Sequence, residues 1–256
     1  MAAAEPTAPN AAVIQEQYLS SGSTERAQIL TLTDEEIVAV DHSTQSVVPL
    51  YWYSQQTPAD KRLALAVASR GLVARGWAQG DPTATSTTDL ALVPADPLAA
   101  LLDLRKTARL IVLAEQKSTL ETRARAYYLQ TGDSALEEAV NSGGLHRFST
   151  LPQVAAISDL ALWCDPYLSP TPDNPWSTRV DSPDDLESVA SSRLGDTRIV
   201  TVVAAVAPAT TVPSRRYLTV YVGDGRLSVC GLEQGDGWIR DVSHRELVER
   251  LTAMVQ

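Results

Sequence analysis

Two stretches of this sequence repeat the same order of patterns, and this internal repeat limits the possible folds more than any other feature. The first stretch runs from Asp96 to Trp163 and the second from Ser182 to Met254. Each opens with an amphipathic segment, continues through strand-like apolar runs and closes with a helical pattern. Two copies are too few for a solenoid. The repeat therefore predicts one globular body with internal pseudo-twofold symmetry.

The apolar positions of the two copies fall opposite one another. The aligned positions include Ile111 and Val200 in the first strands, Phe148 and Ile239 before the closing helices, and Leu160 and Leu251 within those helices. We expect Ile111 and Val200 to be fully buried, and Leu160 and Leu251 to pack on one face of the sheet. The predicted fold class is α+β, a pseudo-twofold pair of helix-β-β-β-helix halves that form a mainly antiparallel central sheet flanked by helices.

The rest of the chain is interpreted as additions to this repeat. Low periodicity at the start predicts a poorly ordered segment, and five prolines within residues 163–185 predict a linker between the copies. The expected division is a flexible N-terminal tail (1–28), an N-terminal strand and helix segment (29–95), the first repeat half (96–167), a proline-rich linker (168–181) and the second repeat half (182–256), all within one globular body.

Helix starts are marked by capping signals. Thr33 with Glu36, and Ser243 with Glu246, have the spacing of a capping box, in which the hydroxyl and the carboxylate bond reciprocal backbone N–H groups. Thr57-Pro58 predicts a further helix that ends where Gly71 adopts a left-handed conformation. The turn residues GDG at 223–225 predict a hairpin.

Three consecutive aromatic residues, Tyr51, Trp52 and Tyr53, follow Pro49 in a segment that we interpret as extended. Such rings are frequent anchors at protein interfaces, so these are the candidate binding residues. However, the chain has only one Phe, and Trp and Tyr must supply its large packing side chains. Packing in the core or against a subdomain is therefore the favoured role.

No catalytic residue, metal ligand or cofactor site is predicted. His42 stands between Asp41 and Ser43, but adjacent side chains cannot form a triad. We expect His146 and His244 at the surface without a second ligand at metal spacing. Cys164 and Cys230 are isolated and fit reduced, structural thiols. A net charge of −10 disfavours nucleic acid as a partner, and no stretch has the length for membrane insertion.

Two segments carry a resemblance to a known family. ALAVASRGLVARG (64–76) and, after a loop, DPLAALLDLRKTARLIVLA (96–114) precede a strand-rich unit with a closing helix. This order, with the repeat, resembles the EspG family of type VII (ESX) secretion chaperones of actinobacteria. The resemblance implies a cytoplasmic, non-enzymatic protein that binds the apolar helical tip of a PE–PPE-like secretion substrate. No family contact residue is matched by a motif here.

Two other function classes are weighed against the chaperone. A winged-helix-like DNA-binding regulator would use residues 57–70 as its recognition helix, but the acidic charge argues against it. A small-molecule enzyme would use a cleft between the halves, but the histidines and cysteines offer no matched catalytic set.

Overall fold

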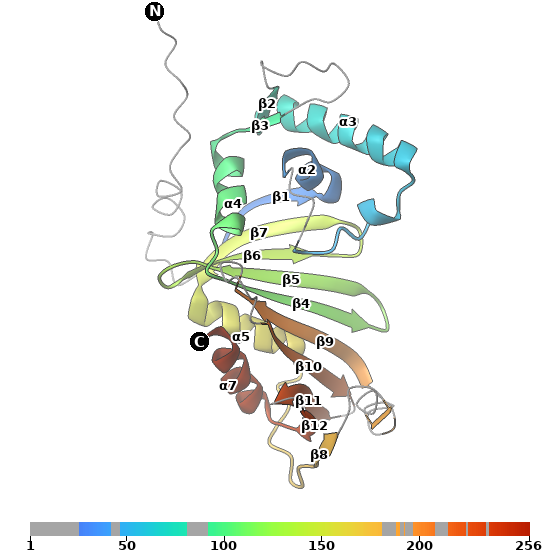
Figure 1. Cartoon of the computed structure of the whole chain (residues 1–256), viewed down its shortest axis with the longest axis vertical. Helices are drawn as coiled ribbons and strands as arrows, with labels where there is room; N and C mark the ends of the chain where they lie inside the picture. Colours follow the sequence, from blue (N-terminus) through green and yellow to red (C-terminus); the bar gives the residue numbers. More distant parts are fainter. Residues whose placement is uncertain are drawn as a thin grey trace, which may run out of the picture.

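A ten-stranded antiparallel sheet forms the centre of the molecule in the computed structural model (Figure 1). The structure describes residues 26–41, 47–80, 92–180, 188–189, 192, 197–207, 215–223, 225–233 and 236–256. In spatial order the strands are β1 (Ala27–Thr33), β7 (Leu145–Pro152), β6 (Ser134–Val140), β5 (Thr122–Leu129), β4 (Leu110–Ser118), β9 (Thr197–Val206), β10 (Arg215–Gly223), β11 (Arg226–Glu233), β12 (Asp236–Asp241) and β8 (Ser177–Val180). The predicted α+β class with an antiparallel central sheet is confirmed.

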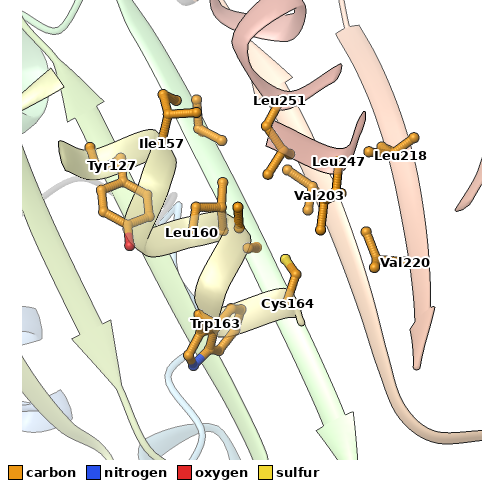
Figure 2. Close-up of a cluster of buried hydrophobic side chains, with 14 of the residues drawn as sticks. Tyr127, Ile157, Leu160, Trp163, Cys164, Val203, Leu218, Val220, Leu247 and Leu251 are labelled. Atoms are coloured by element: carbon orange, nitrogen blue, oxygen red, sulfur yellow. The ribbon is translucent and has the colours of Figure 1, made fainter. Parts of the chain in front are cut away.

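Helices cover the two faces of the sheet unequally. The helices α5 (Gln153–Cys164) and α7 (His244–Val255) lie side by side on one face and bury a core to which both halves contribute. Figure 2 shows Leu160 of α5 and Leu251 of α7 directed into this core. Over the first half, the opposite face carries α2 (Asp34–Val40), α3 (Pro58–Ala74), α4 (Asp96–Lys106) and a small hairpin of β2 (Ala78–Gly80) and β3 (Leu92–Pro94).

The pseudo-twofold relation is centred between β4 and β9, which pair with each other in the middle of the sheet. Ile111 faces Val206, and Lys117 faces Val200. If Ile111 is equivalent to Val200, Lys117 is equivalent to Val206, so the twofold relation maps one of these residue pairs onto the other. The strand pairing can be followed outward from β4 to β7 and from β9 to β12. Phe148 of β7 and Ile239 of β12 then occupy equivalent positions in the two halves, as the alignment predicts.

One burial expectation is wrong. Ile111 is buried, but Val200 is only half-buried. In β9 the neighbours Thr201 and Val203 are fully buried, and alternate residues of a strand point to opposite faces. Val200 therefore lies on the face that α5 and α7 do not cover.

The prediction of three strands in each half is also wrong, because each half has four strands before its closing helix. The first half gains β6, whose sequence SALEEAV carries two glutamates and lacks an apolar alternation. The second half gains one because residues 226–241 form the hairpin of β11 and β12. The edge strands β1 and β8 add a fifth strand to each half, and β8 lies within the segment expected to be a linker.

The helix signals are mostly confirmed. Both capping boxes form, with Thr33 and Ser243 as N-caps. Thr57 caps α3, but this helix continues past Gly71 to Ala74, and Gly76 adopts the left-handed conformation instead, with φ of 71°. The predicted hairpin joins β10 to β11. The expected tail up to residue 25, His42 and most of the opening helix of the second half lie outside the described residues.

Candidate protein-binding surface

The three candidate residues Tyr51, Trp52 and Tyr53 form a turn, called the aromatic turn below, that leads into the 3₁₀ helix η2 (Tyr53–Gln55). The extended conformation expected for this segment is wrong. Tyr51 packs against the core cluster of the first half. Trp52 keeps 37% of its surface exposed. The turn thus anchors itself through one ring and presents another to solvent.

A buried carboxylate holds the backbone of the aromatic turn in place. Asp34, at the start of α2, is fully buried and accepts hydrogen bonds from the backbone N–H groups of Trp52 and Tyr53, each at 2.8 Å. The backbone of Gly144 packs directly against the Asp34 carboxylate. A Cβ at this position would lie 2.8 Å from that carboxylate and 2.9 Å from the Cβ of Trp52. With φ of 73° as well, this position requires glycine.

Asp34 belongs to a larger set of buried charges. His146 Nε2 lies 2.6 Å from Asp34 Oδ1, and His146 Nδ1 lies 2.7 Å from Glu138 Oε1. The hydroxyl of Tyr128 donates to Glu138 at 2.6 Å. Arg105 then lies 3.2 Å from Glu138 and 3.0 Å from Asp41. We call this set the ionic cluster: Asp34, Asp41, Arg105, Tyr128, Glu138 and His146.

The charges of the cluster stabilise one another. Burial alone would lower the pKa of His146, but its hydrogen bonds to Asp34 and Glu138 outweigh burial and raise that pKa. Burial alone would raise the pKa of Glu138, but Arg105 and His146 lower it. Both ring nitrogens of His146 face carboxylate oxygens, an arrangement that favours the charged imidazolium. His146 is fully buried, so the expectation that it lies at the surface is wrong. It alternates with exposed Arg147 along β7, so the two side chains point to opposite faces.

Next to the aromatic turn, part of the sheet is open to solvent. Burial and the negative charge of Glu115 raise the pKa of the Tyr51 phenol, which places the turn beside β4. Glu115 is exposed and faces Val202 of β9 across the ladder. Val202 is 45% exposed and Tyr217 of β10 is 49% exposed. We call this surface of β4, β9 and β10 the open face; it lies opposite α5 and α7.

The remaining candidates for chemistry have structural surroundings. Burial raises the pKa of the Cys164 thiol to about 12 and that of Cys230 to about 11, so both are protonated at neutral pH. His244 Nδ1 lies 3.0 Å from buried Asp165 Oδ2, which ties the start of α7 to the end of α5. Within the described residues, no group of three or more His, Cys, Asp or Glu side chains could hold a metal ion.

The helix proposed for DNA recognition is α3, and it carries exposed apolar residues. Leu63 and Val67 are 66% and 60% exposed. A phosphate-binding helix presents basic residues instead, so this observation weighs against a recognition helix. In the part of the chain that the structure describes, no helix combines the length and the apolar character that crossing a bilayer requires.

Comparison with known proteins identifies the fold. No family model and no curated protein matches this sequence. Among solved structures, the chain is similar to the Mycobacterium tuberculosis type VII secretion system chaperone EspG5, solved in complex with the PE25–PPE41 dimer. The match covers 88% of this chain and 95% of the EspG5 chain, with a TM-score of 0.57 and 10% sequence identity. The fold that the EspG resemblance implied is therefore confirmed.

Proposed function

We propose that this protein is a cytoplasmic, non-enzymatic chaperone that binds the apolar helical tip of a PE–PPE-like secretion substrate and keeps it soluble. The observation that carries the proposal is the EspG5 fold across 88% of the chain, because EspG5 was solved with a PE–PPE dimer bound. Neither the regulator nor the enzyme has a comparable observation in its favour.

The open face and the aromatic turn are the surface we propose for the substrate. Val202 and Tyr217 supply exposed apolar area on the sheet, and Trp52 supplies an exposed ring on the neighbouring aromatic turn. Aromatic residues at the centre of an interface commonly dominate its binding energy. Exposed Glu115 and Lys117 lie among these residues and would orient a tip that carries its own charges.

The test is co-expression of the tagged full chain with PE–PPE-like pairs encoded in the same genome, followed by affinity purification and mass spectrometry. We expect one helical pair to co-purify in stoichiometric amount. The double variant Trp52→Ala, Tyr217→Ala should weaken this complex at least about 100-fold, since hot-spot rings cost about 2 kcal/mol or more each.

Tyr167→Ala is the matched control, because Tyr167 is 63% exposed and lies outside the proposed surface. It should leave the complex intact. Unchanged melting temperatures would show that the double variant is folded. Failure of every such pair to co-purify would contradict the proposal, and equal weakening by Tyr167→Ala would contradict the proposed surface.

A further inference from the structure

A groove of about 400 Å³ lies on the face of the sheet that carries α5, beside the C-terminal end of that helix. Its floor is a row of paired residues across four strands: Arg125 of β5 faces Ala139 of β6, Ala139 faces Arg147 of β7, and Arg147 faces Thr31 of β1. Strands are spaced about 4.8 Å apart. The short side chain of Ala139 therefore leaves a gap between two arginines whose backbones lie about 10 Å apart.

Two of the lining arginines are held in fixed positions. The Nε and Nη2 atoms of Arg123 donate to Gln116 Oε1 at 3.0 and 2.7 Å. Arg125 Nη1 lies 3.3 Å from Glu137 Oε1. Both guanidinium groups also lie over the ring of Trp163, at 5.3 and 5.2 Å from its centroid. These contacts position the cations before any ligand arrives.

The third arginine is available to a ligand. Arg147 is exposed and lines the groove, and no described residue forms a hydrogen bond or an ion pair with its guanidinium. An arginine presents several N–H donors in a fork that matches a carboxylate. Within the described part of the chain, the groove therefore offers one arginine without a partner next to two arginines that are held in place.

The second half of the molecule shows that the fold does not require this space to be open. By the strand ladders, Ala139 corresponds to Gly231, Arg147 to Trp238 and Arg125 to Leu218. The indole of Trp238 lies so close over Gly231 that a Cβ there would be 2.7 Å from the ring. One half fills the position with an indole, whereas the other lines it with arginines.

We propose that this groove binds an acidic peptide segment of a partner protein. Its carboxylates would pair with Arg147 and with the remaining N–H donors of Arg125, while an apolar neighbour packs on Leu145, which is 47% exposed. Arg123 is already paired with Glu121 of the lining, at 3.4 Å, and contributes its charge to the groove. The chain as a whole carries a net charge of −10, which repels an acidic peptide. Binding therefore depends on these local cations. The site lies on the opposite face of the sheet from the open face and is independent of the proposed chaperone function.

The test is fluorescence anisotropy of a labelled peptide of alternating Glu and Leu, titrated with the full chain at low salt. We expect saturable binding with a Kd below about 1 mM. Arg147→Gln should weaken it at least about tenfold by removing the unpaired guanidinium. Ala139→Leu should weaken it similarly by filling the floor without changing any charge. Arg62→Gln is the control, because Arg62 is an exposed arginine on α3.

Three outcomes would overturn the proposal. The first is no saturable binding by the wild-type chain. The second is an equal loss with Arg62→Gln, which would indicate diffuse attraction between charges. The third is displacement of the peptide by an equal concentration of inorganic phosphate, which would make the groove a small-anion site. Ala139→Leu changes the shape of the groove, whereas Arg147→Gln changes its charge. If one of the two variants fails to fold, the other still tests the proposal.

Discussion

The two halves of the sheet share their strand order but fill equivalent buried positions with opposite chemistry. In the first half Glu138 and His146 lie at the centre of the ionic cluster. The ladders place Cys230 and Gly237 at the same positions of the second half. There Cys230 packs with Ile239 and neighbouring apolar side chains. One framework therefore accommodates either buried charges or an apolar cluster.

The difference follows from what is inserted between equivalent strands. After edge strand β1, the chain forms α2, η2, α3 and the β2–β3 hairpin before it returns to the sheet through α4. After β8, β9 begins at Thr197. The ionic cluster joins this insertion to the sheet, because Asp34 and Asp41 come from α2 and its C-cap, while Glu138 and His146 come from β6 and β7. We therefore expect these buried charges to specify where the inserted segment docks.

The largest effect is expected from breaking the ionic cluster. Glu138→Leu removes the carboxylate that Arg105, His146 and the Tyr128 hydroxyl share, and it leaves buried donors without that acceptor. The free energy of unfolding should therefore fall by about 3 to 5 kcal/mol. Cys230→Ala, at the equivalent position, should cost only about 1 kcal/mol because it removes one small buried group. Urea denaturation of both variants measures the contrast. Similar losses at the two positions would show that the halves are stabilised in the same way.

Equal effects are expected where the halves agree. Leu160 and Leu251 are fully buried in the core between α5, α7 and the sheet. Truncation of either to alanine should lower the free energy of unfolding by about 2 to 4 kcal/mol. The two losses should agree within about 1 kcal/mol if the helices are equivalent. A loss at one position only would show that the two helices contribute unequally to stability.

The pH dependence of stability should come from the first half. The pKa of His146 is raised in the folded state, so its contribution is complete below about pH 6.5 and is lost as pH rises through the folded pKa. The pKa of Glu138 is lowered, so its contribution is present above about pH 4.5 and is lost as pH falls through its folded pKa. Asp34, Asp41, Arg105 and Tyr128 are the other groups of this site.

Urea denaturation between pH 6 and pH 9 tests the histidine. The wild-type chain should lose free energy of unfolding over this range, by less than Glu138→Leu costs, because neutral imidazole keeps one hydrogen bond. His146→Gln should lack this dependence, since an amide does not titrate. An unchanged slope in the variant would assign the pH dependence to groups outside the cluster.

The sequence predicts features that depend on neighbouring residues. Both capping boxes, the central strands and the closing helices follow from spacing within a few residues, and all are present. The repeat adds the pairing of the halves, because similar patterns fold similarly.

Features that depend on residues far apart in the sequence cannot be predicted from local sequence patterns. The local sequence around His146 predicts a surface residue. Its burial depends on the contact with Asp34, which lies 112 positions earlier in the chain. The strand β6 was missed for the same reason, since Glu138 is tolerated in a buried strand only because Arg105 and His146 compensate it. The backbone of the aromatic turn donates hydrogen bonds to Asp34, a tertiary contact that cannot be predicted from the sequence of the turn alone.

The smallest contrast concerns the two capping boxes, which have the same chemistry in different surroundings. Thr33 begins α2 in the first half and Ser243 begins α7 in the second. Each helix start is also braced elsewhere: Asp34 bonds the aromatic turn and His146, while the backbone N–H of His244 donates to the carbonyl of Ser169 at 2.9 Å. Alanine at either cap should therefore cost only the capping bonds, about 1 kcal/mol each.

Urea denaturation of Thr33→Ala and Ser243→Ala compares the two caps directly. Thr57→Ala at the exposed start of α3 is a third case, in which the carboxylate of Asp60 accepts from the Thr57 hydroxyl and no capping box forms. If Thr33→Ala costs clearly more than Ser243→Ala, the cap of α2 and the ionic cluster act as one cooperative unit, because freeing the first turn would then also displace Asp34. Equal losses would mean that Asp34 is held by its buried partners alone. The docking of the insertion would then depend on the charges and not on the helix that carries them.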